Sequence, residues 1–113
     1  MAWYRNFKFD RFVAKDGENG FEACEKKAFS VEGEPTETIR FEGNSVKDLF
    51  YLMDKGTPVI AMKSNSNAIL LVGYDAKTVT YIDPMSGTVY THNIGKVDEM
   101  LKEGGNTFLA YIK

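Results

Sequence analysis

Length and composition limit what this protein can be. The chain has 113 residues, fewer than the roughly 150 of an average domain, which excludes a multidomain enzyme with separate cofactor and substrate lobes. Apolar residues make up 43% and charged residues 27% of the chain, as is typical of a globular protein. The 14 basic and 16 acidic residues give a net charge of −2, so strong electrostatic attraction to nucleic acid or anionic lipid is excluded.

Cysteine and histidine each occur once. Cys24 alone cannot form an internal disulfide or a multi-thiolate metal site, and His92 alone cannot form a His-pair site. The longest apolar run, Ala68–Val72, is far shorter than a membrane span, and the first residues have no apolar signal core. We therefore expect no cofactor, no metal, no membrane insertion by this segment and no secretory leader. We expect a soluble segment that is either cytoplasmic or part of a larger surface or export protein, and the sequence does not decide between the two.

We expect one domain over residues 1–113, with a variable N-terminal part (1–43) and a core of sheet and helix (44–113). The loose alternation of Trp3–Val13 predicts a strand or an irregular arm. Its aromatic side chains need a surface to bury against, so we expect the arm to pack on the domain, and a partner surface is the alternative.

Helical spacing occurs three times along the chain. Phe21, Cys24 and Ala28 predict a helix over Gly20–Ser30. The second and clearest helix carries apolar residues at helical spacing, has Asn44 or Ser45 as its cap and ends at Gly56 before Pro58; the apolar residues are Val46, Leu49, Phe50 and Met53. A third is predicted over Gly95–Lys102, with Ile94, Val97 and Leu101 facing inward.

Strands are predicted over the remaining segments. Four runs joined by short polar turns favour an antiparallel meander; they are Val59–Lys63, Ala68–Tyr74, Thr78–Asp83 and Thr88–His92. Short strands at Thr38–Glu42 and Thr107–Ile112 complete the set. Ala68–Val72 is apolar on both faces and should be a central strand. The class is α+β, an antiparallel sheet of about five to six strands with two to three helices packed on it.

The second part of the chain carries a recognisable set of motifs. They are Gly56–Ala61, then Asn67–Asp75 with its Gly-Tyr-Asp end, then Tyr81–Pro84 and Gly87. In this order and spacing they resemble the second half of the papain-like peptidases, closest to the double-glycine-leader (bacteriocin-processing) peptidases. The resemblance covers roughly residues 45–113 and implies a papain-like half-barrel.

The resemblance also implies a chemistry that this chain departs from. In the family a cysteine near the start of the first long helix attacks the peptide bond, a histidine before Gly-Tyr-Asp takes the thiol proton, and an aspartate orients the histidine. The aspartate position is Asp83, but Asn67 occupies the histidine position, and an amide cannot act as a base near neutral pH. Acidic Glu22 and Glu25 near Cys24 would raise the thiol pKa.

The resemblance therefore predicts a domain that has the peptidase fold but lacks the peptidase activity. Such a domain would serve as a peptide-binding or structural module of a larger bacterial export or surface system. Its partner would be an extended peptide or a protein, and its binding positions would be Asn67, Asp83 and Tyr74. Asn67 and Asp83 would be relics of the catalytic pair, with the Asn67 amide donating a hydrogen bond to Asp83.

Other interpretations remain open at the level of sequence. An active cysteine peptidase would use Cys24 with His92 as an unorthodox base. Cys24 is otherwise a small buried hydrophobic residue, Asp83 an Asp-Pro turn opener, and Asn67 an ordinary hairpin residue. A third possibility is that the likeness to the peptidases is convergent. In that case the strand order should differ from that of the papain-like half-barrel.

Overall fold

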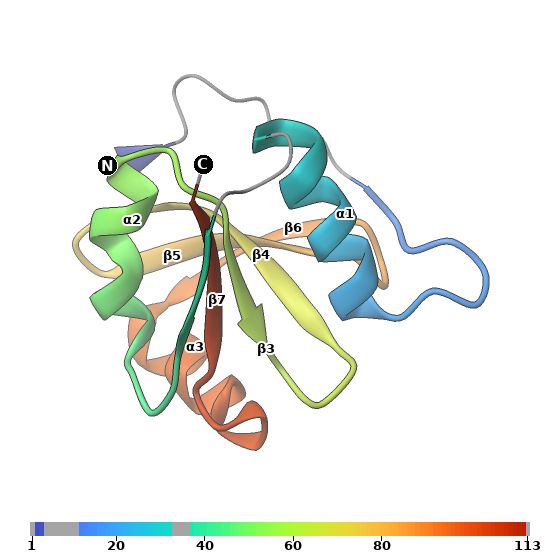
Figure 1. Ribbon diagram of the computed structural model, residues 1–113. Helices are drawn as coiled ribbons and strands as arrows, with labels where there is room; N and C mark the ends of the chain where they lie inside the picture. Colours follow the sequence, from blue (N-terminus) through green and yellow to red (C-terminus); the bar gives the residue numbers. More distant parts are fainter. Residues whose placement is uncertain (1, 4–11, 33–36, 113) are drawn as a thin grey trace.

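A meander of four strands forms the larger part of the sheet in the computed structural model, which describes residues 2–3, 12–32 and 37–112 (Figure 1). The strands are β3 (Val59–Met62), β4 (Ala68–Tyr74), β5 (Thr78–Asp83) and β6 (Thr88–Asn93), each antiparallel to the next. The first six residues of β4 are buried, which confirms the expected central strand covered on both faces. The ladder between β4 and β5 shifts register between Leu71 and Gly73.

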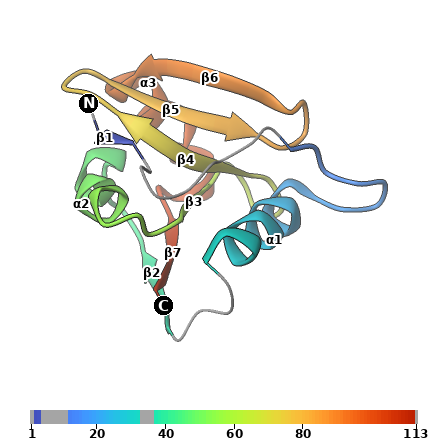
Figure 2. The same cartoon turned by 90° about the horizontal axis from the view of Figure 1, so that it is seen from above.

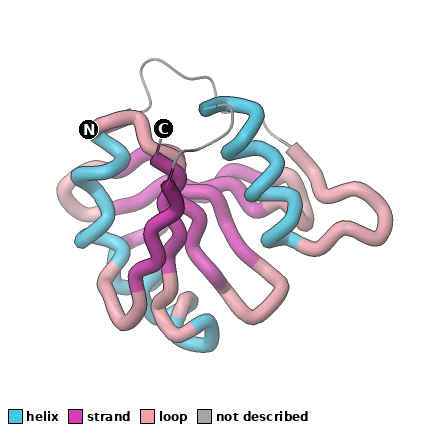
Figure 3. Tube along the Cα trace, in the orientation of Figure 1, coloured by secondary structure: helices cyan, strands magenta, loops and turns pink. Residues whose placement is uncertain are grey.

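Two more strands complete the main sheet in an order that differs from the order along the chain. The last strand, β7 (Phe108–Ile112), lies between β3 and β2 (Glu37–Phe41), and the sheet runs β2-β7-β3-β4-β5-β6. The short strand β1 (Ala2–Trp3) pairs with the end of β4. All pairs are antiparallel. The predicted α+β class with an open sheet of this size is confirmed, and Figure 3 shows the helices and strands along the chain.

The helices cover opposite faces of the sheet. Figure 2 shows α1 (Gly20–Glu32) on one side, and α2 (Phe50–Asp54) and α3 (Ile94–Met100) on the other. On the α1 side, the hydroxyl of Tyr111 donates to Glu25 at 2.9 Å. On the other side, the rings of Phe50 and Tyr74 stack with 3.9 Å between their centres. Apolar side chains from both layers form one core around the central strands.

The helix expected after Ser45 begins with a tighter turn than predicted. Val46–Leu49 is a 3-10 helix, and only Phe50–Asp54 is α-helical. Ser45 is the N-cap, as expected, and forms a capping box with Asp48. Asp98 binds both the Ser45 hydroxyl at 2.6 Å and the Val46 N–H at 2.7 Å, so the first turn is tied to α3 by a distant side chain.

The third helix is likewise shorter than predicted. It ends at Met100, and a 3-10 turn over Lys102–Gly104 follows. Val97 and Leu101 are buried as expected, and Ile94 is partly buried against the core. Within the described part of the chain, no helix is long and apolar enough to cross a lipid bilayer.

The expected aromatic arm falls mostly outside the described residues, which leave out Tyr4, Phe7 and Phe9. Its first residues form β1, and Phe12 at its other end packs against the core. Val13 is 59% exposed. The interpretation of the arm as core or partner surface stays a prediction.

Candidate functional site

Asn67 lies at the hairpin between β3 and β4 and is exposed. Its carbonyl oxygen accepts hydrogen bonds from the N–H groups of Lys63 (2.8 Å) and Ser64 (3.1 Å), and its own N–H donates to Ser64 Oγ. These bonds are ordinary hairpin closure. The residue at the family's histidine position is therefore held by its backbone, and its side-chain amide faces the start of α1.

The start of α1 packs directly on this hairpin. Phe21 N–H donates to the Ser66 carbonyl at 3.0 Å. A Cβ added to Gly20 would lie 3.3 Å from Asn67 Oδ1, so only a residue this small fits here without displacing a neighbour. Asn19 caps the helix, with reciprocal bonds between Asn19 and Glu22. The residues at the start of α1, which adjoin Asn67, are thus the N-cap Asn19 and Gly20, and neither has a thiol.

Cys24 lies one turn further along α1 and points into the core. Its side chain is fully buried. Burial raises the pKa of the Cys24 thiol far above its usual range, and the negative charge of Asp83 raises it further. A thiol with these properties stays protonated and unreactive near neutral pH.

His92 lies on the opposite face of the sheet from Cys24. Side chains directly opposite each other in a ladder share a face, and successive side chains alternate. The ladder connects Ala110 to Tyr90 through the opposed pairs Ala110–Val59, Val59–Leu71, Leu71–Tyr81 and Tyr81–Tyr90. His92 shares the face of Tyr90, whereas Tyr111 lies on the other face, where it binds α1. The sheet therefore separates the Cys24 thiol from the His92 imidazole.

Among the described residues the Asp83 side chain has two partners, and neither is Asn67. Its Oδ1 accepts a hydrogen bond from the Met85 N–H at 2.9 Å, which is the expected turn-opening role, and its Oδ2 lies 3.7 Å from Lys63 Nζ. No hydrogen bond joins the described side chains of Asn67 and Asp83, so the expected relic pair is not formed. Lys63, and not Asn67, is the side chain that pairs with Asp83. The sequence analysis did not identify Lys63 as a site residue.

Tyr74 lies at the far end of β4 from Asn67, roughly 23 Å away along the strand. Its ring stacks on Phe50, and its hydroxyl donates to Asp54 Oδ1 at 2.7 Å. This hydrogen bond raises the pKa of Tyr74 to about 12, with smaller contributions from burial and the Asp54 charge. The three expected binding positions are thus divided, with Asn67 and Asp83 at one end of the sheet and Tyr74 at the other.

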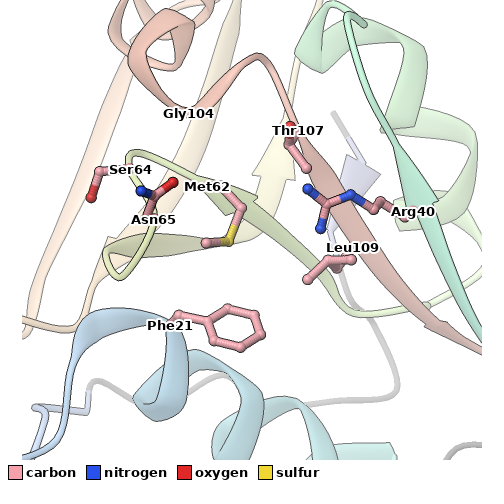
Figure 4. Close-up of a pocket in the computed structure, with 8 residues that line it drawn as sticks. All are labelled: Phe21, Arg40, Met62, Ser64, Asn65, Gly104, Thr107 and Leu109. Carbon is pink, nitrogen blue, oxygen red and sulfur yellow. The ribbon is translucent and has the colours of Figure 1, made fainter.

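A cavity of about 200 Å³ lies beside the hairpin of Asn67, between α1 and the β2–β7–β3 part of the sheet (Figure 4). Its lining residues are Phe21, Arg40, Met62, Ser64, Asn65, Gly104, Thr107 and Leu109. Phe21 faces Met62 and Leu109 across the opening, and the Arg40 guanidinium lies over Thr107 and Leu109. We refer to this cavity as the α1 groove.

Sequence reasoning placed Phe21 on the inner face of a helix but gave no signal for the groove. Its walls come from four segments that are distant along the chain, and only the strand order brings them together. Among the described residues, no three His, Cys, Asp or Glu side chains are grouped so as to hold a metal ion.

Comparison with known proteins bears on the fold. One solved structure, a protein of Bacillus anthracis assigned as a C39-like peptidase, matches with a TM-score of 0.55 and 18% sequence identity over 78% of this chain. The fold is that of a C39-like peptidase. No family model matches this chain, and no curated protein matches it. This chain spans 56% of the length of the solved structure, so the likeness concerns the shared fold alone.

Proposed function

We propose that this C39-like domain binds an extended peptide without cleaving it, as a peptide-binding or structural module of a larger bacterial export or surface system. The observation that carries the proposal is the helix start beside Asn67. Nucleophilic peptide hydrolysis needs a thiolate within hydrogen-bond reach of a base. At this position Gly20, next to the N-cap Asn19, lies against Asn67, so both reacting groups are missing from the place where they would meet.

The nearest thiol supports the same conclusion. Cys24 is buried, and its pKa is raised by desolvation, which is the opposite of nucleophile activation. The alternative dyad of Cys24 with His92 has no support, because the two side chains lie on opposite faces of the sheet.

The α1 groove is the proposed peptide site. It combines the apolar wall of Phe21, Met62 and Leu109 with polar groups at Arg40 and Thr107. Its volume, about 200 Å³, suits one or two side chains of a ligand more than a whole small molecule. Asn67 lies in the same hairpin as Ser64 and Asn65, which line the groove, so its place in the proposal is at the border of the bound peptide. Asp83 is linked to this hairpin through its ion pair with Lys63.

The test is selection of a random peptide library displayed on phage against the full chain, followed by fluorescence polarisation with the selected peptides. Phe21→Ala should weaken binding by at least about tenfold, because it removes one apolar wall. Tyr51→Ala is the matched control: Tyr51 is a 50% exposed aromatic residue on α2, on the other face of the sheet.

Two results would contradict the proposal. Mass spectrometry that shows the selected peptides cleaved on incubation would make the domain a peptidase. Binding that survives Phe21→Ala but is lost in Tyr51→Ala would move the site to the other face.

A further inference from the structure

The two edges of the sheet differ in how they are protected. An exposed strand edge offers unpaired N–H and C=O groups, and natural proteins guard it with charges, proline or bulges. β2 follows that rule, with exposed Glu37 and Arg40 and an ion pair from Arg40 to Glu42 just beyond the strand. β6 does not. Its residues are Thr88, Val89, Tyr90, Thr91, His92 and Asn93, with no Lys, Arg, Asp, Glu or Pro.

The unguarded edge is long and regular. β6 pairs with β5 over six consecutive residues without a register shift. It borders the sheet in Figure 2, and within the described residues no strand pairs with its outer side. An edge of this length, with strand-favouring Thr, Val and Tyr, is a template for another strand.

We propose that β6 pairs antiparallel with β6 of a second copy of this chain, which joins the two sheets across a two-fold axis. The neutral edge permits this pairing because like charges never meet across it. A two-fold axis perpendicular to the sheet keeps each face on its own side, so one residue must lie opposite itself, and its neighbours pair symmetrically around it.

The side chains of β6 favour Thr91 as the self-paired residue. Tyr90 then lies opposite His92 of the second copy, and each copy already stacks these two rings, 5.5 Å apart and 20° from parallel. Tyr81 packs beside both rings, so two ring clusters (Tyr81, Tyr90 and His92 of each copy) merge into one aromatic stripe.

The other face of β6 fits the same register. Thr80 and Thr91 share a hydrogen bond of 2.8 Å between their hydroxyls. Self-pairing at Thr91 extends this to a row of four threonines across the two copies, a favourable cross-strand pairing. With Tyr90 as the centre instead, His92 would face Thr88, and the stacked rings would not continue.

The expected complex is weak. Five paired residues on each side bury less than the roughly 1,200 Å² of a stable interface. The dissociation constant of the dimer should therefore be larger than about 1 μM. The β6 edge is separate from the α1 groove, which is lined by residues of α1 and of the β2–β7–β3 part of the sheet, so failure of one proposal leaves the other intact.

The test compares charge at the two edges by sedimentation equilibrium of the full chain. Wild type should show a concentration-dependent dimer. Thr91→Lys places two like charges opposite each other and should weaken association by roughly tenfold. Thr38→Lys is the matched control, an exposed threonine on β2, and should leave association unchanged. Thermal melting of each variant establishes that it is folded.

A disulfide test fixes the register without a destabilising charge. Under mild oxidation Thr91→Cys should give a covalent dimer, because a self-paired residue brings its two Cβ atoms close to disulfide distance. Asn93→Cys, two residues away on the same face, should not. Cys24 is buried and does not compete. The proposal is overturned if wild type stays monomeric up to about 1 mM, if Thr38→Lys weakens the dimer as Thr91→Lys does, or if Asn93→Cys cross-links and Thr91→Cys does not.

Discussion

Lys63 links the two positions that resemble a catalytic pair: its N–H donates to the Asn67 carbonyl at 2.8 Å, and its Nζ lies 3.7 Å from Asp83 Oδ2. The Asp83 side chain is only 18% exposed, so its charge is partly removed from water, and the ammonium offsets that cost. At the two positions where the resembled family has a histidine and an aspartate, this chain has a hairpin residue, Asn67, and an ion-paired aspartate, Asp83.

The first prediction measures this ion pair. Lys63→Met and Asp83→Asn, alone and combined, should give a coupling free energy of about 0.2–1 kcal/mol in urea denaturation, because the pair is part-exposed and its distance is long. Asp83→Asn keeps an oxygen for the Met85 N–H, so the turn survives and the cycle reports the charge alone. A coupling of zero would mean that the two groups do not interact in solution.

The second prediction concerns the thiol. In the folded chain Cys24 should react with iodoacetamide at least about 100-fold more slowly than in the urea-unfolded chain at pH 5 to 10, because labelling requires opening of α1. The control is Ser30→Cys in a Cys24→Ala background; it puts a thiol on the exposed side of the same helix and should label at the unfolded rate. Fast labelling of Cys24 with a midpoint below about 8.5 would indicate an activated thiolate.

The third prediction restores the family's histidine. Asn67→His should hydrolyse neither casein nor the selected peptides, because the neighbouring helix start still holds Asn19 and Gly20 in place of a thiol. Asn67→Ala is the comparison variant. Hydrolysis by Asn67→His that disappears when Cys24→Ala is added would show that the buried thiol reaches the new imidazole, and would reverse the proposed function.

The fourth prediction uses the titration of Tyr74. Its pKa is about 12 in the folded chain against 10.0 for the free side chain, so the folded state holds the proton more tightly. The resulting stability is fully present below pH 10 and is lost as the pH rises toward 12. Tyr74→Phe should therefore be less stable than wild type by about 0.5 kcal/mol at pH 8, with the difference shrinking from pH 10 to 12. A difference that stays constant over that range would exclude the hydrogen bond to Asp54.

The fifth prediction tests the close contact beside the groove. A Cβ at Gly104 would overlap the Met62 carbonyl oxygen. Gly104→Ala should destabilise the chain by about 1–3 kcal/mol, since backbone must move to admit the methyl group. In Gly95→Ala the added carbon meets only the Asn93 side-chain oxygen at 3.3 Å, so a much smaller loss in urea denaturation is expected. Equal losses in both variants would contradict this account.

Local patterns in the sequence were enough to predict most elements and the α+β class. β4 and β5 have the predicted bounds because alternation and polar turns record which side chains each strand buries, and that information is local. The inner face of α1, with Cys24 and Ala28 buried, follows from helical spacing for the same reason.

Only the tertiary structure decided the candidate site. Burial patterns do not say which distant segment pairs with an edge, so the insertion of β7 between β2 and β3, which builds the α1 groove, was not predictable. The same holds for the sheet that separates Cys24 from His92 and for Lys63 as the partner of Asp83. The local pattern of apolar and polar residues indicates which side chains are buried. The tertiary contacts of a buried side chain depend on which distant strands pair in the sheet.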